Sequence, residues 1–215
     1  MRRGLLLLLA GLLLATPLAG QVRRMERYDD TFKKYSKRFF GPAFDWRLFK
    51  AQAMTESNLD SAAQSWVGAR GIMQLMPATF KEIQTSNPDF LSIDDIEWNI
   101  AAGIFYDRRL WRLWRDSVDT QDHRHFMFAS YNAGRIPILR AQGLARTRTL
   151  DPRLWPSIET VAPEVRGWRH RETLGYVHRI TMNLGRMDAR GRVVRREPPP
   201  LPGPVGTGAG AASVP

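Results

Sequence analysis

Apolar residues recur at helical spacing through most of the chain, and strand patterns are poor. Trp46, Phe49, Ala53 and Glu56 share one face, which predicts a helix over about 46–56 with Asp45 as N-cap. The other expected helices begin at Pro77, run from about 96 to 114 behind a Ser92 cap, and cover 125–131 and 174–184. The fold class is therefore mainly α, with loops expected at 57–71, 84–92, 115–122 and 141–168.

The first twenty residues have the layout of a secretory signal peptide. Arg2 and Arg3 precede an apolar run over 5–14, and small residues follow it, with cleavage expected after Gly20. The run is about half the ~20 residues that a membrane-spanning helix needs, so a permanent anchor is the weaker alternative. We expect export to the periplasm or cell envelope.

The C-terminal end also differs from the middle of the chain. It is Arg-rich from 186 to 196, and from 198 onward it is mostly Pro, Gly, Ala, Ser and Val without a charged side chain. Such a stretch buries too little apolar surface to offset its ordering entropy. We expect a disordered tail over 186–215, and one domain of ordinary size over 21–185.

The chain is strongly basic and contains no cysteine. With 32 Lys and Arg against 21 Asp and Glu, its formal charge is +11. A basic surface attracts polyanions, and export favours the anionic cell wall, or a weak membrane-surface association, over nucleic acid. The alternative is a solvated basic surface with no specific partner. The lack of cysteine excludes disulfides, thiolate metal sites and lipid attachment through cysteine.

Glu56 is the first candidate for chemistry, because it continues an apolar helix face. A carboxyl group that points inward at the C-terminal end of a helix is desolvated and faces the negative end of the dipole. Both effects raise its pKa, and a protonated carboxylic acid near neutral pH is what protonation of a glycosidic oxygen requires. The alternative is a structural Glu that pairs with an Arg or caps a backbone group, and periodicity alone favours that alternative.

The segment that follows Glu56 has features of a binding loop. Gly68 and Gly71 allow close approach of the backbone to another group. Gln74 offers a donor and an acceptor for acetamido and hydroxyl groups, and Met76 offers an apolar surface for a sugar face. The alternative is a glycine turn, core methionines and the start of a helix.

Four segments resemble, in order and spacing, the signature motifs of the soluble-type (SLT domain) lytic transglycosylases. They are Glu56-Ser57, the stretch from Gly68 to Pro77, Ala129-Ser130-Tyr131-Asn132-Ala133-Gly134, and Glu172-Thr173-x-x-Tyr176-Val177. The approach from Phe39 to Trp46 is similar to the catalytic domain of membrane-bound lytic transglycosylase F. The resemblance covers about 40–185 and implies a goose-type-lysozyme-like helical domain with a substrate groove.

The resemblance also implies roles for individual residues. Glu56 would be the catalytic acid/base, and the residues that bind sugar or hold the site would be Ser57, Ser65, Gln74, Met76, Tyr131, Asn132, Glu172 and Tyr176. The implied reaction cleaves the bond between N-acetylmuramic acid and N-acetylglucosamine in peptidoglycan. The muramic C6 hydroxyl closes a 1,6-anhydro ring, and no cofactor takes part. We expect a monomer.

Two other functions remain open at this point. A hydrolytic muramidase of the same fold would usually need a second carboxylate, and Asp60 lies beyond the expected end of the Glu56 helix. A non-catalytic wall-binding protein would need no acid at all. A metal site is not expected, because the four histidines lack His-Glu-x-x-His spacing. We interpret aromatic residues at helical spacing, such as Trp111 and Trp114, mainly as core.

Overall fold

Helices make up most of the computed structural model, which describes residues 25–194. They are α2 (Asp29–Phe40), α3 (Arg47–Ser57), α4 (Pro77–Ser86), α5 (Ile96–Trp114), α6 (His123–Ala133), α7 (Arg135–Thr147), α8 (Trp155–Val161), the 3₁₀ helix η1 (Ala162–Glu164) and α9 (His170–Gly185). The prediction of a mainly α protein is confirmed. The expected signal peptide over 1–20, and the expected tail from 195 onward, lie outside the described residues.

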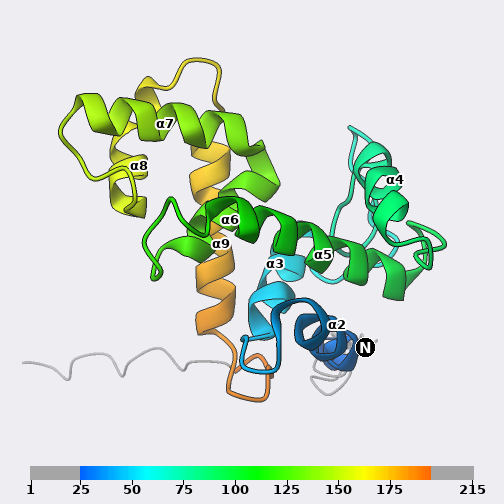
Figure 1. The fold of residues 1–215 in the computed structure, drawn as a ribbon. Helices are drawn as coiled ribbons and strands as arrows, with labels where there is room; N and C mark the ends of the chain where they lie inside the picture. Colours follow the sequence, from blue (N-terminus) through cyan, green and yellow to red (C-terminus); the bar gives the residue numbers. More distant parts are fainter. Residues whose placement is uncertain (1–24, 195–215) are drawn as a thin grey trace, which may run out of the picture.

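The long helix α5 runs through the middle of the molecule (Figure 1). It packs against α2 and α6, and α9 packs against α3 and α6. Helix α4 lies at one end of α5, and α7 and α8 lie at the opposite side of the molecule (Figure 1). Fully buried side chains such as Phe49, Ile104 and Phe126 join these helices into a single apolar core. No helix within 25–194 is both long and apolar enough to cross a membrane.

The expected loop over 141–168 is wrong, because it contains the second half of α7 and all of α8. Both helices contain Pro or Gly residues, which disfavour a helix prediction from the sequence. Pro137 lies in the first turn of α7, where a missing N–H costs no hydrogen bond, and Pro156 has the same place in α8. Gly143 interrupts the middle of α7, but the buried Ile138 and Ala145 on either side hold the helix against the core.

The caps at the starts of two helices differ from those expected. The N-cap residue of α3 is Trp46, without a side-chain hydrogen bond, and not Asp45; the Asp45 carboxylate, one residue earlier, accepts from the backbone N–H of Arg47 (3.0 Å). The Ser92 cap expected for α5 is wrong. Asp95 takes that place by accepting from the N–H of Trp98 (3.0 Å), while the Ser92 hydroxyl accepts from Asp94 in the preceding turn.

The ordered domain extends past residue 185, where the sequence placed the start of the tail. Residues 187–193 form a hairpin in which Met187 and Val193 pair. Gly191, at the turn, lies so close to the Trp46 ring that a Cβ atom would clash with it. The buried Lys50 ammonium donates to the Gly191 carbonyl (2.8 Å) and pairs with Asp29 of α2 (2.6 Å). Lys50 therefore joins α2, α3 and the C-terminal hairpin.

Candidate active site

Glu56 lies in the last turn of α3. The face that carries it also carries Phe49 and Ala53, both fully buried, so the helix directs Glu56 toward the interior as the pattern predicts. The chain then leaves the helix through Asn58, whose left-handed backbone (φ 53°) ends it. The Glu56 carboxyl group is therefore held at a helix end, half-buried, beside a loop.

Burial raises the pKa of Glu56 to about 7, well above its ordinary value. Two neighbours act in the opposite direction: the Tyr176 hydroxyl donates a 2.5 Å hydrogen bond to Oε1, and the positive charge of Arg179 favours the carboxylate. Oε2 has no hydrogen-bond partner within residues 25–194, and it is not fully enclosed. One oxygen is thus fixed by Tyr176, while the other has no protein partner in the described part of the chain.

The loop over 58–76 is tied to the end of α3. The Ser57 hydroxyl donates to the Ile72 carbonyl (2.9 Å), which fastens the loop beside Glu56. The Gln74 side-chain amide donates to the carbonyls of Gly71 (2.9 Å) and Ala63 (3.1 Å), across the base of the loop. Gln74 therefore uses its donor group within the loop, and its side-chain oxygen is the part left for a ligand.

Ser65 begins a tight turn at the far end of this loop. Its backbone N–H donates to the Ala69 carbonyl (2.9 Å), and its own carbonyl accepts from Gly68 (2.9 Å). Its hydroxyl accepts from the Ala69 N–H (2.9 Å). Ser65 therefore stabilises the conformation of this turn. This role is additional to the sugar contact that the resemblance implies.

Asn99 fastens the same loop to α5, and the sequence reasoning missed it. Its carbonyl oxygen accepts from the Met73 N–H (2.9 Å), and its amide donates to the Arg70 carbonyl (3.0 Å). Gly71 packs directly against it, with φ 77° and no room for a Cβ atom. The available signal was the polar Asn99 between apolar turns of α5, on the same face as Gly103 and Asp107.

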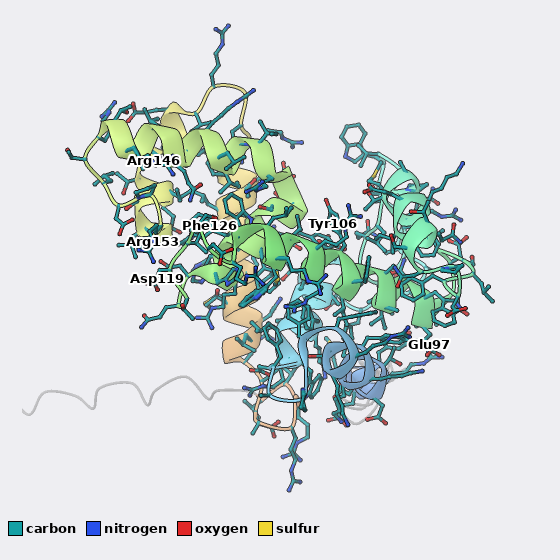
Figure 2. All side chains as sticks on the ribbon, in the orientation of Figure 1. Glu97, Tyr106, Asp119, Phe126, Arg146 and Arg153 are labelled. Atoms are coloured by element: carbon teal, nitrogen blue, oxygen red, sulfur yellow. The ribbon has the colours of Figure 1, made fainter. Side chains whose placement is uncertain are left out.

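Two tyrosines from separate helices close the site. Tyr131, near the end of α6, donates to the Met73 carbonyl (2.8 Å), and its ring packs edge-on against Tyr106 of α5. Figure 2 labels Tyr106, which lies near the middle of α5. Tyr176 of α9 donates to Glu56. Burial raises the pKa of both Tyr131 and Tyr176, so the two hydroxyls stay neutral donors.

The other residues suggested by the resemblance lie nearer the surface. Met76 is 41% exposed just before α4, and Asn132 is exposed at the end of α6. Glu172 lies one turn before Tyr176 on α9, where it pairs with Arg169 (2.6 Å) on the exposed start of the helix. Glu172 has no hydrogen bond to Glu56 in the described part of the chain, so any support that it gives the site is indirect.

A second carboxyl group lies near Glu56, but it is closed off from solvent. Asp107 of α5 is fully buried, and its partner is the Gln52 amide at 3.4 Å. Burial holds the pKa of Asp107 well above its ordinary value, and the negative charge of Glu56 adds to this effect. Asp60, beyond the helix, accepts from the Ala62 N–H in a turn. Neither group is arranged as a general base that activates water.

The chain is similar to known proteins in family, in sequence and in fold. The family model for the transglycosylase SLT domain matches residues 30–152. A membrane-bound lytic murein transglycosylase F from Desulfosudis oleivorans is 32% identical over 168 residues, which are 73% of this chain and 35% of that protein. A protein of the same name from Vibrio cholerae is 33% identical over 142 residues, 66% of this chain and 25% of its own.

Solved structures of similar fold include the 70 kDa soluble lytic transglycosylase from Escherichia coli. It superposes with a TM-score of 0.55 at 26% identity, over 80% of this chain and 28% of that one. The complex of a 70 kDa soluble lytic transglycosylase with bulgecin A superposes with a TM-score of 0.53 at 26% identity, over 81% of this chain and 28% of that one. The mainly α, lysozyme-like fold expected from the sequence is confirmed. This chain spans only a quarter to about a third of the length of these relatives.

Proposed function

The chain belongs to the family of transglycosylase SLT domains, and from this premise we propose that it is a peptidoglycan lytic transglycosylase. The resemblance found in the sequence motifs is confirmed by the family match. The proposed substrate is the β-1,4 bond between N-acetylmuramic acid and N-acetylglucosamine. The proposed product carries a 1,6-anhydro ring on the muramic sugar.

The observation that carries this proposal is the state of Glu56. A pKa of about 7 keeps a large fraction of this carboxyl group protonated at neutral pH. The fixed Oε1 and open Oε2 leave one oxygen free to act on a substrate. A general acid must carry a proton at working pH and must have an oxygen available to the leaving group, and the raised pKa and the unpartnered Oε2 of Glu56 support this role.

The reaction proceeds in two steps with Glu56 in both. Glu56 first gives its proton to the glycosidic oxygen, the bond to the anomeric carbon breaks, and the muramic acetamido oxygen bonds to that carbon. The Glu56 carboxylate then takes the proton of the C6 hydroxyl, whose oxygen displaces the acetamido group and closes the ring. Tyr176 stabilises the carboxylate between the steps by its hydrogen bond to Oε1.

A hydrolytic muramidase is the second candidate, and the state of Asp107 argues against it. That enzyme would use a second ionised carboxylate to activate water. Asp107 is fully buried, which closes it off from a water nucleophile and raises its pKa, while Asp60 is engaged in a turn. The one-carboxylate scheme is therefore the better supported of the two.

The place of action is proposed to be the cell envelope. The relatives are named as membrane-bound or soluble lytic transglycosylases, and murein forms part of the names of the membrane-bound ones. The order of charged, apolar and small residues over 1–20 supports export by a signal peptide. The basic charge of the chain supports contact with the anionic wall.

Digestion of purified sacculi tests the proposal. We expect the wild-type protein to release muropeptides that end in anhydro-muramic acid, and Glu56→Gln to release none while it keeps the wild-type circular dichroism spectrum. Products lighter by one water than the hydrolytic ones identify the anhydro ring in mass spectrometry. Release at the normal rate by Glu56→Gln would overturn the assignment of Glu56. Products with a free reducing end would support the muramidase instead.

A further inference from the structure

Trp66 is the most exposed large apolar side chain in the described part of the protein, at 92% of its full surface. The chain has seven tryptophans, all within residues 25–194, and the other six are buried or half-buried. Two neighbours along the loop are also exposed, Val67 at 49% and Met76 at 41%. An indole ring in water leaves a large apolar area unburied, and such groups are typical of binding surfaces.

The backbone beneath Trp66 is held in place. Trp66 and Val67 are the two central residues of the turn that Ser65 and Gly68 close, and a further pair of hydrogen bonds joins Ser65 to Ala69. Gly68 adopts φ 90°, a backbone conformation that favours glycine. Trp66 is thus presented on an ordered turn, which lowers the entropy that a ligand contact has to offset.

The turn is continuous with the site around Glu56. Gln64 pairs with Arg70, and Trp66 lies two residues further out, or about 7 Å along an extended chain. Ile72, two residues from Arg70 in the other direction, accepts the hydrogen bond of Ser57, the neighbour of Glu56. One short strip of loop therefore links the acid to the exposed ring.

We propose that Trp66 is a sugar-stacking platform that binds a ring of the glycan strand away from the bond that is cut. This inference rests on the proposed function. A pyranose ring presents a face of C–H groups, which packs on an indole ring, while its hydroxyl groups remain in water at the rim. The exposed apolar atoms of Val67, the next residue of the turn, add to this apolar surface.

The chemistry of the surroundings favours a neutral sugar ring over a charged ligand. Arg70, the charged side chain nearest along the loop, is paired with Asp94 (2.6 Å) and is not free for an anion. Gln64, Ser65 and Gly68 carry no charge. A flat apolar ring beside uncharged polar groups is suited to carbohydrate.

Binding is best measured in the Glu56→Gln background, which does not cut the probe. The probe is peptide-free glycan strand prepared from sacculi. We expect Trp66→Ala to weaken binding about tenfold, the effect of removing one aromatic contact, and Trp66→Phe to restore most of the affinity. Leu91→Ala is the matched control, because Leu91 is 75% exposed on another loop, and it should bind as the parent does.

Fluorescence gives a second readout that a merely structural role would not change. Acrylamide quenches exposed indole rings, so the strands should protect the parent from quenching and should have little effect on Trp66→Phe. With Glu56 intact, Trp66→Ala should raise KM for long strands and leave kcat unchanged.

Three results would overturn the inference: equal affinity of Trp66→Ala and the parent, no protection from acrylamide, or protection that grows with protein concentration alone. The last would indicate that a second copy of the chain covers Trp66. The proposed function fails separately, if Glu56→Gln still cuts sacculi.

Discussion

At the scale of single residues, the proposed chemistry depends on a carboxyl group kept out of water. Burial raises the pKa of Glu56 to about 7, which suits the proposed role of this residue as an acid. The same burial costs stability. The unfolded chain releases the Glu56 proton near pH 4.5, whereas the folded protein retains it up to about pH 7. Glu56 therefore lowers the free energy of unfolding progressively as the pH rises from about 4.5 to 7.

Glu56→Gln is expected to stabilise the protein while it abolishes activity. The pKa difference corresponds to at most about 3 kcal/mol above pH 7, and to nothing below pH 4. Urea unfolding of both proteins at pH 4 and pH 8 measures this. If the variant had a lower free energy of unfolding than the wild type at pH 8, Glu56 would stabilise the fold at that pH, and the prediction would be wrong.

Tyr176→Phe is expected to move the pH dependence of the rate. Because the Tyr176 hydrogen bond lowers the pKa of Glu56, its loss raises that pKa further. The decline in kcat/KM on the alkaline side, expected near pH 7 for the wild type, then shifts to higher pH, and the maximal rate falls. Tyr35→Phe is the control, since it removes a tyrosine hydrogen bond to Glu97 outside the site. An unshifted profile for Tyr176→Phe would show that the decline does not report Glu56.

At the scale of elements, the sequence predicts helices where apolar spacing is regular and fails where tertiary contacts decide. The helices around Glu56, Pro77 and Tyr131 follow the pattern, and Glu56 points inward as expected. Helices α7 and α8 contain Pro and Gly that mask the pattern. In these two helices burial against the core outweighs local propensity.

The loop beside the site was harder to predict than the helices. Its Gly-rich composition indicated close backbone approach, but not the partner. That partner is Asn99, which lies 28 positions after Gly71 in the sequence (99 − 71). The two residues come into contact only when α5 packs against the loop. Gln74 and Ser65 looked like ligand contacts, and in the structure both also hold the loop. The sequence pattern alone does not distinguish a side chain that only binds substrate from one that also holds the loop.

Gly71→Ala tests how the loop depends on this contact. A Cβ atom would lie 2.5 Å from the Asn99 amide, at a positive φ. We expect a loss of about 1–3 kcal/mol in stability, with a larger proportional loss of activity because the loop beside Glu56 shifts. Gly143→Ala is the matched control in α7, where no atom lies within 4 Å, and it should stabilise by about 0.5–1 kcal/mol. Equal effects of the two changes would contradict the role given to Gly71.

At the scale of the whole molecule, the ends of the ordered domain meet on α3. Lys50 is fully buried between Asp29 of α2 and the Gly191 carbonyl of the hairpin. Burial raises the pKa of Asp29, and the Lys50 charge acts against that rise. Removal of one partner of a buried ion pair leaves the other without compensation. The sequence gives no sign of this contact, because it joins residues 141 positions apart.

Lys50→Met is expected to destabilise the protein by about 3–5 kcal/mol, the usual cost of breaking a buried pair from one side. Since Lys50 lies away from the hydrogen bonds of Glu56, the folded fraction should keep its rate. Lys81→Met, at an exposed position of α4, is the control and should change stability by less than about 0.5 kcal/mol. Thermal unfolding combined with activity at low temperature separates the two effects. A small effect of Lys50→Met would show that the ends of the domain are joined by other contacts.

The central claim is that Glu56 alone drives a cleavage in which the sugar's own C6 hydroxyl, and not water, displaces the leaving group. Digestion of sacculi in ¹⁸O-labelled water, followed by mass spectrometry of the released muropeptides, tests it most directly. The account predicts anhydro products without ¹⁸O at the muramic anomeric carbon. Reducing-end products that carry one ¹⁸O atom at that carbon would contradict it.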